Sequence, residues 1–244
     1  MDGIPVVKAS HLVDAASTVT VSDAASTHYV SRAAFKLKGA LDACMPLGLT
    51  VAGRRALDAG ASTGGFTQVL LEHGVSHVVA VDVGHHQMAP SVRDDPRVTA
   101  IEGVNVRDLS ATSEGSGVDL VVADLSFISL TLVLEPLVAF AAPRADYVLM
   151  VKPQFEVGRG GLDGGGVVRT ARARAQAVHG VARAMTGIGM VIHSIERSAL
   201  PGPAGNQEYF IWGSTSWQAD PTGPRPVLDN AQMERAVAQA VKGE

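Results

Sequence analysis

Residues 55–65 read RALDAGASTGG, an apolar strand pattern interrupted by an acid and followed by a turn of small residues. A second apolar run, HVVAVD (77–82), ends in another acid, Asp82. Glycines allow a backbone to approach a ligand closely, and the start of the helix that follows offers unpaired N–H groups. This order of strand, turn, helix and strand is typical of a Rossmann-like sheet that opens onto a nucleotide-type ligand.

The glycine spacing narrows the choice of ligand. It matches neither GxGxxG nor the phosphate-binding GxxxxGK[ST], so NAD and ATP are the weaker candidates. An acid at the tip of the next strand suits a ribose diol, because Asp82 can accept hydrogen bonds from two hydroxyl groups. S-adenosylmethionine, a cationic adenosyl ligand without phosphates, fits better, although the turn alone leaves another α/β protein open. We therefore expect a methyltransferase.

Strand and helix patterns alternate along the rest of the chain. Strands are expected over residues 56–60, 77–83, 97–103, 118–126, 146–152, 190–200 and 208–214. Helices are expected over residues 29–44, with Ser31 as N-cap, and over 65–74, 130–142, 169–186 and 229–242. Repeated strand–helix units predict a parallel sheet, and the two neighbouring terminal strands predict an antiparallel addition. The predicted fold is an α/β, Rossmann-like, seven-stranded and mostly parallel methyltransferase sheet with an antiparallel edge pair.

Composition excludes several classes of protein. The chain has 244 residues, of which 46% are hydrophobic, as in a globular protein of one large domain. No apolar run is long enough to span a membrane, and no signal peptide is visible. Its single cysteine, Cys44, excludes an intrachain disulfide and fits a reducing compartment, so a cytoplasmic protein is expected. Histidines lack metal-ligand spacing, so no metal is expected.

The net charge of −4 gives no overall signature of nucleic-acid binding, but the basic residues are grouped. If both groups shared a face, the local potential could hold phosphates despite the acidic total; otherwise they are solvated helix faces. One group contains Arg32, Lys36, Lys38, Arg54 and Arg55; the other contains Lys152, Arg159, Arg169, Arg172, Arg174 and Arg183.

Four residues stand where the ligands of parallel sheets usually lie, at or near the carboxyl ends of strands. Asp124 ends VDLVVAD, Lys152 ends DYVLMVK, Lys36 lies on the first helix and Glu208 opens the last strand. A lysine at the end of a buried strand is costly unless it is paired. A structural ion pair between Lys152 and Asp124 is one interpretation. The other is a general base, because partial burial and a second nearby cation favour a neutral amine.

Five segments together resemble the TlyA family, ribosomal RNA 2′-O-methyltransferases historically called haemolysins: YVSRAAFKL, ALDAGASTGGFTQVLL, VVADLSFISL, VKPQFEVGRG and LPGPAGNQEYFIW. The resemblance implies an FtsJ-like core with a Lys-Asp-Lys-Glu tetrad at Lys36, Asp124, Lys152 and Glu208. It also implies that S-adenosylmethionine is bound by Gly60, Ser62, Gly64, Gly65, Phe66, Asp82, Asn105 and Asp124. The implied substrate is a cytidine 2′-hydroxyl in ribosomal RNA of the small subunit, and for many members of the large subunit.

The resemblance also predicts a domain plan. Members usually begin with a complete S4-type RNA-binding domain, and residues 1–22 resemble only its final strands. We expect an S4-type remnant over 1–22, a linker over 23–30, the methyltransferase domain over 31–214, and a tail with a helix over 215–244. Two other functions stay open. They are a membrane-active cytolysin and a catalytically silent RNA-binding assembly factor.

Overall fold

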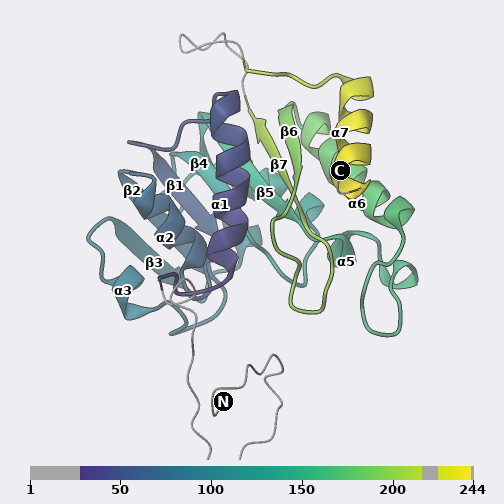
Figure 1. Cartoon of the computed structure of the whole chain (residues 1–244). Helices are drawn as coiled ribbons and strands as arrows, with labels where there is room; N and C mark the ends of the chain where they lie inside the picture. Colours follow the sequence, from purple (N-terminus) through teal and green to yellow (C-terminus); the bar gives the residue numbers. More distant parts are fainter. Residues whose placement is uncertain (1–27, 216–224, 243–244) are drawn as a thin grey trace, which may run out of the picture.

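The computed structural model describes residues 28–215 and 225–242 (Figure 1). The S4-type remnant expected over 1–22, and most of the expected linker, lie outside the described residues. Seven strands form one sheet in the order β3-β2-β1-β4-β5-β7-β6. Their bounds are β1 Arg55–Ala59, β2 His77–Asp82, β3 Val98–Glu102, β4 Val118–Ala123, β5 Ala141–Val151, β6 Val191–Arg197 and β7 Tyr209–Ser214.

The sheet confirms the predicted fold class. Strands β1 to β5 pair in parallel, whereas β7 runs antiparallel to both β5 and β6. The carboxyl ends of β1, β2, β4 and β5 therefore share one edge of the sheet, where ligands bind in open α/β folds.

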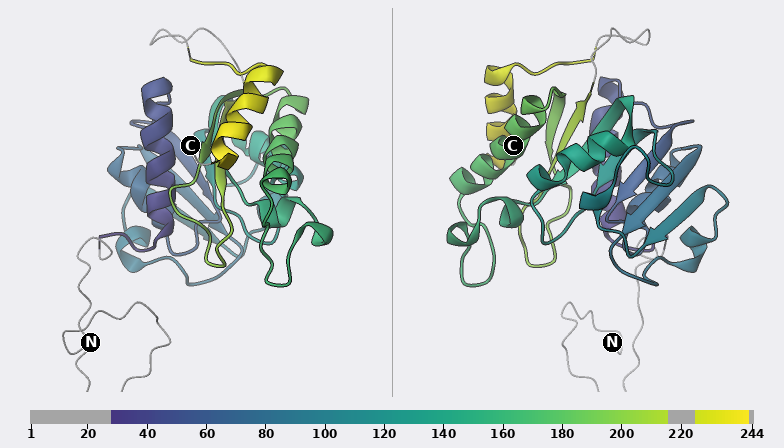
Figure 2. Two further views of the ribbon diagram at one scale, coloured as in Figure 1. Left: turned by 45° about the vertical axis from the view of Figure 1, so that its right-hand side comes forward. Right: turned by 180° about the vertical axis from the view of Figure 1, so that it is seen from behind.

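Helices cover both faces of the sheet, as Figure 2 shows from two sides. Alternation along each strand decides which side chains face which layer: Ala56 belongs to the buried cluster that includes residues of α1 and α2, and the next residue, Leu57, belongs to the cluster that includes residues of α4, α6 and α7. The helices are α1 Ala33–Cys44, α2 Gly65–Glu72, α3 Pro90–Arg93, α4 Leu134–Phe140, α5 Pro153–Glu156, α6 Ala171–Gly187 and α7 Asn230–Lys242. The helix expected in the tail is thus α7, which packs on β6 and α6.

Two local predictions are wrong. The helix expected over 130–142 is divided into a short 3₁₀ turn, Leu130–Leu132, and α4, which ends at Phe140. Residues from Ala141 onward belong to β5, because Pro143 cannot continue a helix and the residue before a proline favours extended backbone. Ser31 does not cap α1: Arg32 occupies the N-cap position, and the Ser31 carbonyl, not its hydroxyl, accepts a hydrogen bond from the Ala34 amide.

Candidate active site

The glycine turn after β1 forms the floor of the site. Gly60 has φ +84°, and a Cβ atom there would lie 2.8 Å from the Asp124 carbonyl oxygen. A Cβ on Gly65 would overlap the Ser31 hydroxyl at the start of α1. Only glycine therefore allows the turn to pass this close to β4 and α1. Gly64 caps the start of α2, and the buried Phe66 is in its first turn.

Asp82 lies across the turn, at the end of β2. Its carboxylate accepts hydrogen bonds from the backbone N–H groups of Ser62, at 2.8 Å, and Gly84, at 2.7 Å. Ser62 has φ +47° and its hydroxyl lies 3.2 Å from the Gln87 amide oxygen. Each carboxylate oxygen can accept more than one hydrogen bond, so these contacts orient Asp82 without exhausting it.

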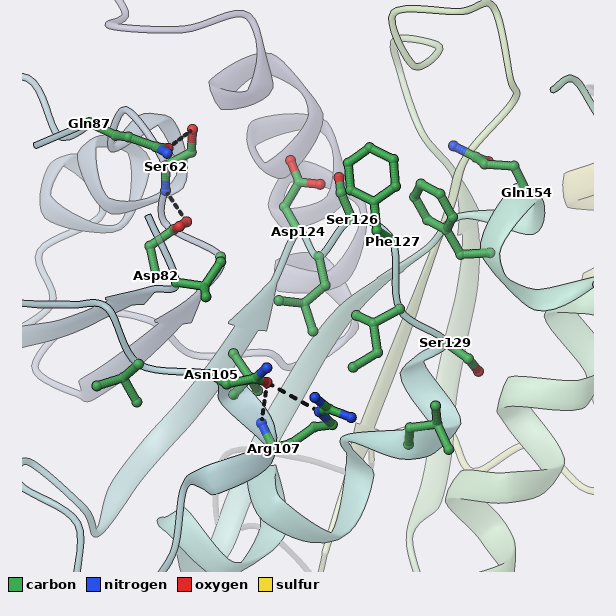
Figure 3. Close-up of a pocket in the computed structure, with 18 of the residues that line it drawn as sticks. Ser62, Asp82, Gln87, Asn105, Arg107, Asp124, Ser126, Phe127, Ser129 and Gln154 are labelled. Atoms are coloured by element: carbon green, nitrogen blue, oxygen red, sulfur yellow. Dashed lines mark hydrogen bonds between the residues drawn. The ribbon is translucent and has the colours of Figure 1, made fainter. Parts of the chain in front are cut away.

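A cleft of about 1050 Å³ runs along the carboxyl ends of the strands (Figure 3). One side is lined by Gly60, Ser62, Asp82, Asn105 and Asp124, all predicted to bind the cofactor. Asn105 also has a structural task, because its side-chain oxygen accepts a hydrogen bond from the Arg107 amide at 3.0 Å and caps a 3₁₀ turn. The opposite side is lined by residues that follow β4 and β5: Ser126, Phe127, Ile128, Ser129, Leu132, Gln154, Phe155, Gly158 and Leu162.

A smaller pocket of about 260 Å³ adjoins the turn and brings Lys36, Asp124 and Lys152 onto one lining with Gly60, Gly65 and Phe66. Lys152 Nζ lies 2.6 Å from Asp124 Oδ1 and donates a hydrogen bond of 2.9 Å to Ser126 Oγ. Lys36 Nζ lies 2.6 Å from Glu208 Oε2. Both lysines are buried, at 4% and 9% exposure.

Glu208 does not line this pocket itself. It is 1% exposed and reaches the site through Lys36. A Cβ on Gly202 would lie 2.6 Å from Glu208 Oε1, so the turn between β6 and β7 closes tightly over the carboxylate. The four residues singled out in the sequence therefore form two ion pairs. Both members of the Lys152–Asp124 pair line the pocket, whereas only the lysine of the Lys36–Glu208 pair does.

Sequence reasoning missed Ser126 and Phe127. Ser126 is the second partner of Lys152, and the Phe127 side chain is 92% exposed, with φ +64° and its ring 5.3 Å from that of Phe155. An aromatic side chain held in the left-handed region at the rim of a cleft suggests a ligand-binding role. The only signal in the sequence is the position of the segment LSFIS, directly after Asp124.

The two groups of basic residues noted in the sequence do not form one common surface, because the members of the first group lie at opposite edges of the sheet. Arg32 and Lys36 line the pocket near Lys152, but Arg54 and Arg55 lie at the start of β1, at the opposite edge of the sheet. Arg54 is paired with Asp146, and Arg174 is bonded to the Tyr209 hydroxyl. In the described parts of the chain, no three His, Cys, Asp or Glu side chains are placed to hold a metal ion. None of the described helices is long and apolar enough to cross a membrane.

Asp58 lies inside β1, behind the turn, and is fully buried. It accepts a hydrogen bond from the Thr67 hydroxyl at 2.6 Å, but burial raises the pKa of its carboxyl to about 7. In the unfolded chain the pKa of an aspartate is about 3.9. The folded state therefore binds this proton more tightly than the unfolded chain does. The contribution of the Asp58 carboxyl to the free energy of unfolding consequently falls as the pH rises from about 4 to about 7.

Replacing Asp58 with asparagine is expected to make the free energy of unfolding depend less on pH. Between pH 5 and pH 8, the free energy of unfolding of the wild type should fall by roughly 2–3 kcal/mol more than that of Asp58→Asn. Urea unfolding of both proteins at several pH values measures the difference. The exposed Asp42→Asn variant is the control. Parallel curves for wild type and Asp58→Asn would contradict the expectation.

Comparison with known proteins gives one consistent family. Residues 29–215 match the model of the FtsJ-like methyltransferase family. A Mycobacterium tuberculosis protein named 16S/23S rRNA (cytidine-2′-O)-methyltransferase TlyA is 49% identical over 239 residues, which cover 98% of this chain and 87% of that protein.

Some of the more distant relatives carry another name. Hemolysin A of Brachyspira hyodysenteriae is 33% identical over 211 residues, covering 86% of each chain. A solved structure of a hemolysin-named protein from Streptococcus thermophilus is 33% identical and superposes with a TM-score of 0.77, covering 88% of this chain and 75% of that one.

Proposed function

The chain belongs to the FtsJ-like methyltransferase family, and on that premise we propose that it methylates the 2′-hydroxyl of a cytidine in ribosomal RNA. S-adenosylmethionine is the methyl donor. The relative from M. tuberculosis, whose name states this reaction, aligns with 98% of the chain. The observation that carries the proposal is the shared pocket in which Lys36, Asp124 and Lys152 adjoin the glycine turn.

The residues around the turn fit the cofactor. Gly60 lies so close to β4 that no side chain fits at this position, which keeps the turn open beside the methionine part of the cofactor. The Asp82 carboxylate can still accept hydrogen bonds from the ribose hydroxyls. Phe66 and Gly65 would bound the methionine end, and Asn105 the adenine end. When bound, the cofactor supplies a methyl group activated by a sulfonium.

Lys152 is the proposed general base. Asp124 and Ser126 occupy two of the contact directions of Nζ, which orients the amine and leaves one direction for the ribose hydroxyl. In its neutral form Lys152 would take the hydroxyl proton as the ribose oxygen attacks the methyl group. Holding the two reacting groups in line supplies a large part of the acceleration.

Lys36 and Glu208 are proposed to support the same step. The Lys36 ammonium adds positive charge to the pocket, which would stabilise a developing negative charge on the ribose oxygen. Glu208, at 2.6 Å from Nζ, fixes the lysine in place and balances its charge. The pair would therefore orient and stabilise rather than exchange protons with substrate.

The Phe127 side of the cleft is the proposed entrance for RNA. Sequence-specific recognition of RNA usually targets unstacked nucleotides, and aromatic side chains stack on bases that have been turned outward. The exposed ring of Phe127, supported by Phe155, is placed on the opposite wall from Asp82. The cofactor would thus occupy one half of the cleft and the target nucleotide the other.

Transfer of labelled methyl groups to isolated ribosomal subunits tests the function. We expect labelled methyl groups in ribosomal RNA of the small subunit. If this chain shares both substrates named for its relative, the large subunit should be labelled as well. In each case the label should be on cytidine ribose only. Methylation mapping of cells with and without the gene should identify the same nucleotide. Binding to subunits without any methyl transfer would instead support a silent assembly factor.

We propose that residues 31–214 form the catalytic domain.

A further inference from the structure

The segment 124–130 links β4 to the 3₁₀ turn and forms one wall of the cleft; we call it the cleft loop. Its first half is held by Lys152, which contacts both Asp124 and Ser126. Its last residues are held by a different group, the carboxylate of Glu156. Lys152 and Glu156 stand at the two ends of one turn of backbone, since α5 spans Pro153–Glu156.

Glu156 bonds the end of the cleft loop twice. Its Oε2 accepts a hydrogen bond from the Ser129 hydroxyl at 2.5 Å, and its Oε1 accepts one from the Leu130 amide at 2.8 Å. The Ser129 hydroxyl also lies 2.7 Å from the Thr131 hydroxyl. Hydrogen bonds to a charged acceptor are stronger than neutral ones, so this contact resists displacement.

Packing behind the cleft loop is uneven: Leu130 belongs to the buried core and Ile128 packs against it, whereas Ser129 lines an open pocket. A pocket of about 330 Å³ separates Ser129 and Thr131 from α6, whose facing residues include the small Ala173, Ala177 and Gly180. Glu156 lines this pocket and spans the space between α5 and the loop. Because a pocket provides fewer van der Waals contacts than a packed core, the position of Ser129 depends strongly on these hydrogen bonds.

The residue displayed between the two anchors is Phe127. Its left-handed backbone, φ +64°, is costly for a bulky residue and persists only where the surroundings impose it. The ring is 92% exposed, so burial of the side chain does not offset this cost. Its contact with Phe155, on α5 next to Glu156, is the one ring contact that the described residues give it.

We propose that Glu156 is a positioning residue for the RNA substrate: by fixing the end of the cleft loop, it holds Phe127 at the rim of the cleft in the conformation that receives the target nucleotide. This inference rests on the proposed function, but it assigns no chemistry to Glu156. The effect of Glu156 on methyl transfer should therefore pass through Phe127 and leave the cofactor half of the cleft unchanged.

A double-mutant cycle tests the coupling. We expect Phe127→Ala, which removes the proposed stacking ring, and Glu156→Ala, which removes the hydrogen bonds that hold it, each to lower kcat/KM for ribosomal subunits about tenfold. The double variant should lose about tenfold and not a hundredfold, because each change removes the same positioned ring. Glu156→Gln can still accept from Leu130 and contact Ser129, so it should recover most of the activity. Glu135→Ala, an exposed glutamate on α4, is the matched control.

Two further measurements separate positioning from misfolding and from failure of the function. The Kd for S-adenosylmethionine, measured by calorimetry, should change less than about twofold in Glu156→Ala. Hydrogen exchange should accelerate at the Leu130 amide in Glu156→Ala and not in Glu135→Ala. Additive losses, a weakened cofactor site or unchanged exchange would overturn the inference. A wild-type chain that methylates neither subunit would overturn the proposed function, while exchange would still decide whether Glu156 holds the loop.

Discussion

Lys152→Ala is expected to lower the rate of methyl transfer to ribosomal RNA by roughly a thousandfold, within the range usual for loss of a general base. The cofactor should still bind, because Asp82 and the Ser62 amide that orients it line the large cleft, whose lining does not include Lys152. Single-turnover transfer of labelled methyl groups to ribosomal subunits measures the rate, and calorimetry measures cofactor binding.

Lys152→Arg makes the test sharper. An arginine keeps the positive charge beside Asp124, which avoids leaving a buried carboxylate without its partner, but its guanidinium stays protonated in proteins. If Lys152 acts as a base, Lys152→Arg should be nearly as inactive as Lys152→Ala. If the lysine is only one half of a structural ion pair, the arginine should retain substantial activity. Lys38→Ala, which changes an exposed lysine on α1, controls for loss of positive charge.

The sequence predicted the position of Asp124 and Lys152, because the apolar pattern marks where strands end and ligands bind at the carboxyl ends of parallel strands. Apolar runs that end in Asp124 and Lys152 mark the tips of two strands, and the tips of parallel strands meet at one edge. The pairing of Lys36 with Glu208 joins residues 172 positions apart. Strand pattern alone could not have paired them, and the family resemblance was needed.

Other features depend on contacts that no local pattern encodes. The left-handed backbone of Phe127 occurs at a residue type that rarely adopts it, and it follows from anchors on another strand end. The helix expected to run to residue 142 stops at Phe140, because Pro143 and the pairing of Ala141 with Val118 both favour extended backbone. In both cases contacts with distant parts of the chain contribute to the conformation of the segment.

Asp146 organises a buried polar cluster at the opposite edge of the sheet from the cleft. It accepts hydrogen bonds from Arg54 at 2.5 Å, Arg225 at 2.9 and 3.1 Å, and the Trp212 indole N–H at 2.9 Å. Asp146 itself is 2% exposed. Its carboxylate thereby joins β5, β7, the segment before β1 and the segment before α7.

Asp146→Ala is therefore expected to lower the free energy of unfolding by about 3–5 kcal/mol, since it leaves buried cations without their carboxylate. Urea unfolding followed by circular dichroism measures the loss, and Asp42→Ala, which removes only a surface pair with Lys38, should cost less than about 1 kcal/mol. Lys152 lies six residues further along the same strand direction, roughly 20 Å away. The folded fraction of Asp146→Ala should then methylate RNA at a nearly normal rate. A decrease in the free energy of unfolding of less than about 1 kcal/mol would contradict the prediction and show that the cluster is dispensable.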